Sequence, residues 1–128
     1  MKFAKIVFRI AGAYGVLALG PLYLLFDRIG SQYPPPITHP QFYYGFVGVA
    51  LAWQFAFFVI ASDPLRYRPL MIPAVLEKVL YAAAILALFR QGRVAPAMAA
   101  TGVPDALFAA LFLVAYFQTK PAGRPDRR

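Results

Sequence analysis

The sequence predicts an all-α fold: an integral membrane four-helix bundle with both termini in the cytoplasm. Of its 128 residues, 61% are hydrophobic and only 14% are charged, whereas a soluble domain carries about 25% charged residues. Charges separate four apolar runs, 10–26, 42–61, 70–89 and 103–119, each close to the ~17–25 residues that cross a ~30 Å hydrocarbon core. Lipid offers no hydrogen-bond partner to the backbone, so a membrane-spanning segment must be a helix or a strand of a closed barrel. These runs are longer than the ~9–11 residues of a barrel strand, so we expect helices.

The distribution of positive charge predicts the orientation of this bundle. Nine cations lie in the N-terminus, the 62–69 loop and the tail, against three in the opposite connections, which places both termini in the cytoplasm of a bacterial-type inner membrane or its equivalent. A lipid bilayer thus accounts for the net charge of +8, and we expect no nucleic-acid partner. Residues 1–119 form one transmembrane domain, and 120–128 form a basic disordered cytoplasmic tail that either meets anionic headgroups or is simply solvated. The nine are Lys2, Lys5, Arg9, Arg66, Arg68, Lys120, Arg124, Arg127 and Arg128, and the three are Arg28, Arg90 and Arg93.

The first run is expected to be a membrane helix with a kink. Its apolar stretch is longer than the ~7–15 residues of a secretory signal, and Pro21 directly follows the only small-residue cleavage pattern. Pro21 also lacks an N–H and predicts a kink ahead of Asp27. In the outer loop that follows, the prolines 34–36 and 40 favour an extended segment. His39 is the only histidine, so one chain cannot supply a multi-histidine metal site.

The second run predicts a close helix contact. Gly45, Gly48, Ala52 and Ala56 fall on one narrow arc of a helix, which makes a stripe of small residues for close packing. Gln54 lies opposite that stripe. Its amide must therefore face another helix or a cavity, because lipid would leave its donors unpaired.

The third run contains an acid beside a base, Glu77 and Lys78. Ser62 or Asp63 is the expected N-cap of the connection before it. Adjacent helical positions point about 100° apart, so we expect Glu77 and Lys78 to pair poorly with one another. Lys78 is expected to extend along the helix to the cytoplasmic headgroups.

Glu77 is too short for that and must be satisfied inside the bundle. Counting from the connections puts it at nearly the depth of Gln54 and Tyr14, which predicts a shared polar layer. Such a layer is either a structural clamp or a site for a ligand or proton, since acids inside membranes are costly and often functional.

The fourth run is the shortest apolar body. Pro104 and Asp105 suit its first turn, so no charge is expected in its interior. The preceding stretch, "VAPAMAATGVPD", is either a tucked-in loop or an extra helical turn.

Residues 10–118 resemble the EXPERA group of small four-helix membrane proteins, which includes sterol Δ8–Δ7 isomerases and the sigma-2 receptor. The resemblance rests on "PLYLLFD", the proline-rich outer loop, "AWQFAFF" and "DPLRY". It implies four helices around a cavity for sterols or sterol-like amines, with Asp27, Trp53, Gln54, Glu77 and Tyr81 as cavity residues. The second helix has no acid in its body, where the isomerases carry one for proton transfer, so the resemblance implies apolar-ligand binding rather than isomerisation.

The sequence therefore predicts a protein that binds an apolar, sterol-like or lipid-like ligand. The alternative is an accessory or structural subunit of a larger membrane complex, and a homo-oligomer is a further arrangement. No nucleotide loop, zinc motif or triad spacing is present, so we predict no catalytic residue, no metal site and no cofactor, and do not expect an enzyme. The predicted ligand-binding residues are Tyr14, Asp27, Trp53, Gln54, Glu77 and Tyr81.

Overall fold

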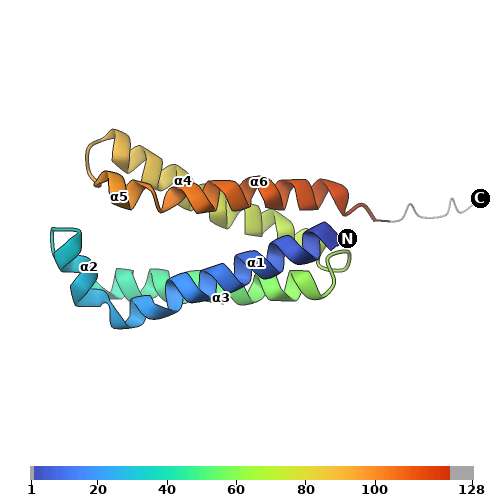
Figure 1. The fold of residues 1–128 in the computed structure, drawn as a ribbon, viewed down its shortest axis with the longest axis horizontal. Coiled ribbons are helices and arrows are strands. Elements are labelled where there is room, and N and C mark those ends of the chain that lie inside the picture. The colour runs from blue at the N-terminus through green and yellow to red at the C-terminus, as the bar shows by residue number, and fades with distance from the viewer. Residues whose placement is uncertain (1, 122–128) are drawn as a thin grey trace, which may run out of the picture.

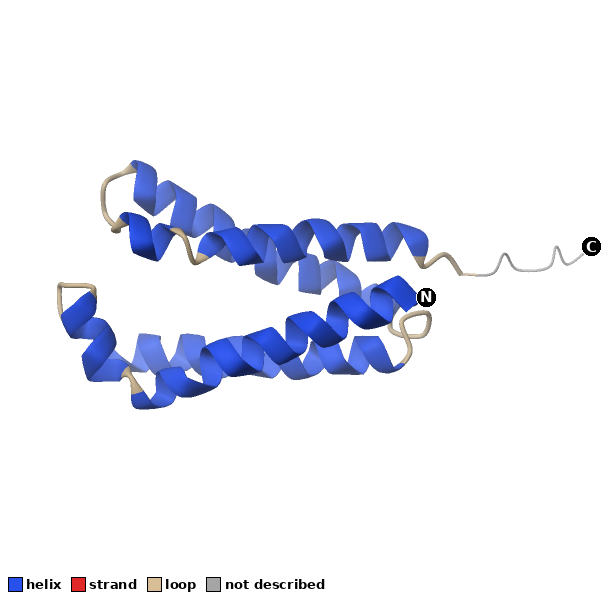
Figure 2. Ribbon diagram, in the orientation of Figure 1, coloured by secondary structure: helices blue, strands red, loops and turns tan. Residues whose placement is uncertain are grey.

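The computed structural model describes residues 2–121, and all regular structure in this part of the chain is helical (Figure 2). Four helical segments are long and apolar enough to cross a membrane: Lys2–Leu24, Pro40–Ser62, Arg68–Arg90 and Pro96–Gln118. The prediction of an all-α protein with four apolar helices is confirmed. Such segments suggest a multi-pass membrane protein.

The first segment combines α1 (Lys2–Leu19) with a 3₁₀ turn, η1 (Gly20–Leu24). Helix α1 starts eight residues before the predicted run, since its charged first turns continue the same helix. The α-helix stops at Leu19, two residues before Pro21, as expected where a proline removes a backbone donor. A short helix that the sequence did not predict, α2 (Phe26–Gln32), follows, and residues 33–39 are not helical.

The second and third segments are α3 (Pro40–Ser62) and α4 (Met71–Arg90), with a 3₁₀ turn, η2 (Arg68–Leu70), directly before α4. The predicted cap at Ser62 or Asp63 is wrong for α4, whose N-cap is Leu70 without a side-chain bond. Asp63 Oδ1 instead accepts the backbone N–H of Arg66 at 3.2 Å and closes a turn in the connection.

The fourth segment consists of α5 (Pro96–Ala99) and α6 (Gly102–Gln118). Of the two alternatives for the stretch before the fourth helix, the extra helical turn is correct. Asp105 lies in the first turn of α6, as predicted, and α5 extends the apolar segment in front of it to Pro96. Most of the predicted disordered tail, residues 122–128, lies outside the described residues.

The helices form two antiparallel hairpins. The most extensive packing joins α1 to α3 and α4 to α6; α1 also packs on α6, whereas α3 and α4 meet only briefly. We call the end with the N-terminus and the α3–α4 connection the inner end. Figure 1 shows the hairpins together at this end and apart at the outer end, where α2 and α5 lie.

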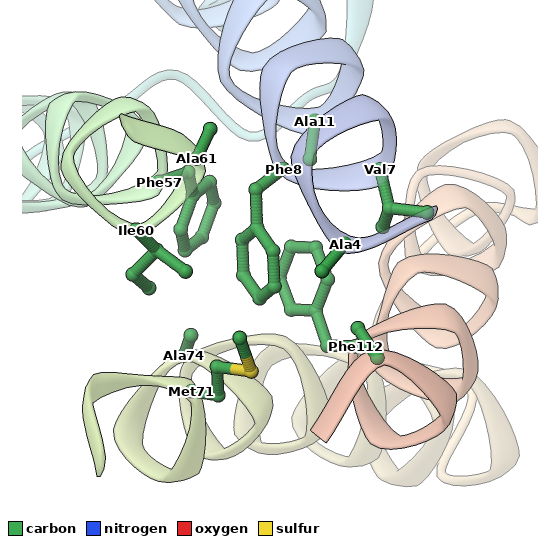
Figure 3. Packing of buried hydrophobic residues seen from close by; sticks show 11 residues of the cluster. Ala4, Val7, Phe8, Ala11, Phe57, Ile60, Ala61, Met71, Ala74 and Phe112 are labelled. Atoms are coloured by element: carbon green, nitrogen blue, oxygen red, sulfur yellow. The ribbon is translucent and has the colours of Figure 1, made fainter. Parts of the chain in front are cut away.

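The hydrophobic core is built around three phenylalanines, one from each of three helices (Figure 3). The ring of Phe8 stacks on that of Phe112 with centroids 4.2 Å apart, and Phe57 meets Phe112 edge-on at 5.0 Å. All three side chains are fully buried. This cluster fastens the two hairpins to each other at the inner end.

The close contact between α1 and α3 depends on glycines of α1. A Cβ added at Gly15 would lie 1.8 Å from Gln54 Oε1, and one at Gly12 would lie 2.9 Å from the Phe58 ring. The predicted stripe on α3 is approached closely at Gly48, where an added Cβ would lie 3.3 Å from the Tyr23 hydroxyl, but not along its whole length within the described residues. A Cβ at Gly45 would meet nothing within 4 Å, and Ala52 is exposed.

Candidate functional site

Two partly buried acids and a buried lysine form a group of charges in the middle of the bundle. Lys78 Nζ lies 3.3 Å from Asp105 Oδ1, to which it donates a hydrogen bond, and 3.5 Å from Glu77 Oε2. We call Glu77, Lys78 and Asp105 the charge cluster. The expectation that Lys78 reaches the headgroups is wrong, since only 4% of the residue is exposed.

The expectation that Glu77 and Lys78 pair poorly is wrong for a related reason. The Cα–Cβ bonds of adjacent residues do diverge, but the four-carbon lysine stem curves back, so its ammonium sits between the two carboxylates. A buried ammonium without a carboxylate would lose its hydration with nothing in return. Pairing inside the bundle is therefore favoured over extension to the surface.

Aromatic rings complete the surroundings of the ammonium. Lys78 Nζ lies 5.4 Å from the ring centroid of Phe57 on α3 and 5.9 Å from that of Phe108 on α6. Both distances are within the range of cation–π attraction. Since Phe57 belongs to the other hairpin, Lys78 joins the two hairpins as well as α4 and α6.

The charge cluster holds one acid more than its single base. Glu77 Oε2 is buried and accepts no hydrogen bond from any described residue, although the Lys78 ammonium is near. A buried acceptor without a donor is costly. The cluster is therefore able to accept a further hydrogen bond at Glu77.

Lys78 and Asp105 were missed as site residues, although the sequence does carry a signal for them. The number of residues from Lys78 to Gln91 equals the number from Gly92 to Asp105. In an antiparallel hairpin that turns at Gln91–Gly92, the two residues must therefore lie at the same level. The same register brings the Tyr81 hydroxyl to 2.6 Å from Thr101 Oγ1.

Gln54 is buried between α1 and α3, on the side away from the α3 stripe, and it faces another helix as predicted. Its Nε2 donates to the Ala50 carbonyl at 2.8 Å, and its Oε1 packs on Gly15 without a hydrogen-bond donor among the described residues. No hydrogen bond joins Gln54 to Glu77 in this part of the chain. The predicted shared polar layer is thus two separate groups, one in each hairpin.

The four other predicted residues lie at different places. Tyr14 packs on Phe108 with ring centroids 5.6 Å apart, and Tyr81 stacks on Phe46 at 5.9 Å. Trp53 packs beside the buried core. Asp27 lies in the first turn of α2 at the outer end, exposed and remote from the charge cluster.

The helix faces that form the core at the inner end are uncovered at the outer end. Residues seven or eleven apart share one face of a helix. On α1, Val7 is 6% exposed and Tyr14 is 45% exposed; on α3, Phe57 is 0% and Phe46 is 47% exposed. The inward faces of the first hairpin therefore become more exposed towards the outer end, although Tyr14 and Phe46 still contact Phe108 and Tyr81 of the second hairpin.

The second hairpin follows the same pattern. On α4, Ala74 is fully buried whereas Tyr81, seven residues later, is half-buried. Phe112 of α6 is buried, whereas Thr101, the N-cap of α6, is exposed. This agrees with the separation of the hairpins in Figure 1. We call Tyr14, Phe46, Tyr81 and Thr101 the open inward faces; the charge cluster lies where they begin.

A separate apolar groove of about 430 Å³ lies between α4 and the α5–α6 segment. None of the six predicted ligand-binding residues lines it. The lining residues are Val79, Ala82, Ala83, Ile85, Leu86, Phe89, Ala99, Gly102, Val103, Ala106 and Ala109.

Compared with known proteins, the chain matches no protein-family model, no curated protein and no solved structure. The assignment of a function therefore depends on the geometry of the charge cluster and of the open inward faces.

Proposed function

We propose that this chain is a multi-pass protein of a bacterial-type inner membrane or its equivalent, with both termini in the cytoplasm, that binds an apolar or lipid-like molecule between its hairpins. The ligand covers the open inward faces, and its polar end lies towards the charge cluster. Of the resemblance to the EXPERA group, this proposal keeps apolar-ligand binding alone.

The observation that carries the proposal is the change from buried to exposed along each inward face. Side chains that face the partner hairpin normally pack fully against it, whereas Tyr14 and Phe46 remain 45% and 47% exposed although they contact Phe108 and Tyr81 of the other hairpin. Binding sites for small molecules are lined mainly by such apolar and aromatic groups, with a few polar groups that fix orientation. Tyr81, Thr101 and the free acceptor of Glu77 provide those polar groups.

A matched pair of phenylalanine variants tests this proposal. Phe46→Ala should reduce the fraction of purified protein that retains an apolar molecule about tenfold, because covering a phenylalanine contributes ~1.5–3 kcal/mol. Native mass spectrometry of protein extracted in mild detergent measures that fraction. Phe55→Ala is the control, since Phe55 is 56% exposed on the same helix but on another face. Equal losses in both variants would contradict the proposal.

Glu77→Gln separates ligand binding from a purely structural role of the acid. A ligand that binds through the charge of Glu77 is held more weakly in this variant, because glutamine keeps an acceptor oxygen but carries no charge. If the thermal stability in detergent falls while the retained molecule is unchanged, Glu77 only clamps the helices, and its place in the site is wrong.

A second candidate function is an accessory subunit or homo-oligomer, and the stripe on α3 favours it. Gly45 and Ala52 face away from the core with no side chain over them. Small residues on a lipid-facing side allow another helix to approach closely.

For that alternative we expect Ala52→Leu to shift the purified protein from an associated to a monomeric state. Size-exclusion chromatography with light scattering measures the mass. Ala110→Leu, at an exposed alanine of α6, is the control. A monomeric wild-type protein, or an equal shift in both variants, would argue against self-association through α3.

A further inference from the structure

The inner end of the bundle carries an excess of positive charge that is not neutralised by nearby acids. Among the described residues of this end, one acid, Asp63, faces six cations. That acid already accepts the Arg66 backbone N–H, and no salt bridge is found there within residues 2–121. The six cations are Lys2, Lys5, Arg9, Arg66, Arg68 and Lys120.

Arg68 differs from the other five because two contacts fix its guanidinium. Its Nε donates to the Tyr116 carbonyl at 3.1 Å, and its Cζ lies 3.7 Å above the centre of the Tyr116 ring. The carbonyl belongs to the last turns of α6, where the partial charge of a helix is negative and attracts a cation. This arrangement holds the guanidinium half-buried in one orientation.

The bond to Tyr116 uses only one of the nitrogens of Arg68. The two terminal nitrogens have no hydrogen-bond or ionic partner among the described residues. A fixed planar guanidinium with free N–H groups suits a phosphate, which it contacts with two parallel hydrogen bonds. Lys120 follows α6 directly, one turn beyond Tyr116, and adds a second cation at the same helix end.

We propose that Arg68 and Lys120 bind the phosphate of an anionic phospholipid headgroup at the inner end of the bundle. The position favours a lipid, because η2 and the end of α6 are the termini of two candidate membrane spans, and headgroups lie at that level. Lys2, Lys5 and Arg9, spaced three and four residues apart on one face of α1, raise the positive potential around the same end. This inference rests on membrane insertion in the proposed function, and it is independent of the ligand between the hairpins.

The affinity of the purified full-length protein for phosphatidylglycerol and for phosphatidylcholine tests the inference. We expect Arg68→Gln and Lys120→Gln each to weaken the binding of phosphatidylglycerol about fivefold, which corresponds to the ~1 kcal/mol of attraction per cation. Binding of phosphatidylcholine should not change. Titration of delipidated protein, followed by native mass spectrometry, gives both affinities.

Arg90→Gln is the matched control, since Arg90 is an exposed arginine at the end of α4, at the opposite end of the bundle. Wild-type affinity in either Arg68→Gln or Lys120→Gln, or an equal loss in Arg90→Gln, would overturn the inference. If Arg68→Gln fails to fold because α6 loses its cap, Lys120→Gln decides, as its side chain makes no such contact. Phe46→Ala should leave the preference for phosphatidylglycerol intact, so failure of the proposed ligand site is distinguishable.

Discussion

Lys78→Met is expected to destabilise the bundle by about 3–5 kcal/mol, the usual result of removing one partner from a buried ion pair. Methionine fills much of the space of the lysine stem but carries no charge, so Glu77 and Asp105 lose the ammonium that lies 3.5 and 3.3 Å from them. Two carboxylates then remain inside the bundle without a cation. The midpoint of unfolding in detergent, followed by circular dichroism, measures the loss.

A compensating variant distinguishes charge from packing. The triple substitution of Lys78→Met, Glu77→Gln and Asp105→Asn removes both the cation and the charges that require it. We expect it to recover part of the stability, because it removes the uncompensated buried charges that make the loss of one partner costly. If Lys78→Met alone is as stable as the wild type, the charge cluster does not hold the helices together.

Gly15→Ala is expected to destabilise the protein by about 1–3 kcal/mol through overpacking. The added methyl group would lie 1.8 Å from Oε1, 2.2 Å from Cδ and 2.6 Å from Cγ of Gln54. The side chain of Gln54 must therefore move, and Gln54 is 1% exposed and bonded to the Ala50 carbonyl. Either that hydrogen bond breaks or α1 and α3 separate, and both costs are measured as a lower unfolding midpoint in detergent.

Gly45→Ala is the control, as a Cβ at Gly45 meets nothing within 4 Å. It should be neutral or slightly stabilising, because alanine is favoured over glycine in a helix by up to about 1 kcal/mol. The double variant Gly15→Ala with Gln54→Ala removes the clashing side chain, and it should be more stable than Gly15→Ala alone. An unchanged midpoint for Gly15→Ala would show that Gln54 adjusts without cost.

The presence of the four apolar helices could be predicted from the sequence, but the residues at which they begin and end could not. In lipid, the backbone of an apolar run of membrane length satisfies its polar groups by forming a helix. Composition and length were therefore enough to predict the four helices. The ends depend on local contacts that composition does not report. Helix α1 continues through the charged start of the chain, and α5 adds a turn before α6 that its prolines did not forbid, since each helix tolerates proline in its first turn.

The candidate site was predicted in part. Glu77 stood out because an acid inside an apolar helix needs a partner, but the choice of partner depends on helix pairing and on the path of a flexible side chain. Lys78 was predicted to reach the headgroups, and Asp105 was not predicted as a site residue although the register of the α4–α6 hairpin identifies it. Gln54 faces a helix, one of the two alternatives predicted for it, yet the glycine that accommodates it, Gly15, belongs to a helix whose rotation the sequence alone does not fix.

The stacked rings of Phe8 and Phe112, with Phe57 edge-on, join the two hairpins near one end of long, stiff rods. When two rods are joined near one end, a small rotation there displaces their free tips in proportion to the length of the rods. The aromatic contact is therefore the pivot about which one hairpin would rotate relative to the other. Any change in the packing of the three rings would therefore produce a larger displacement at α2 and α5.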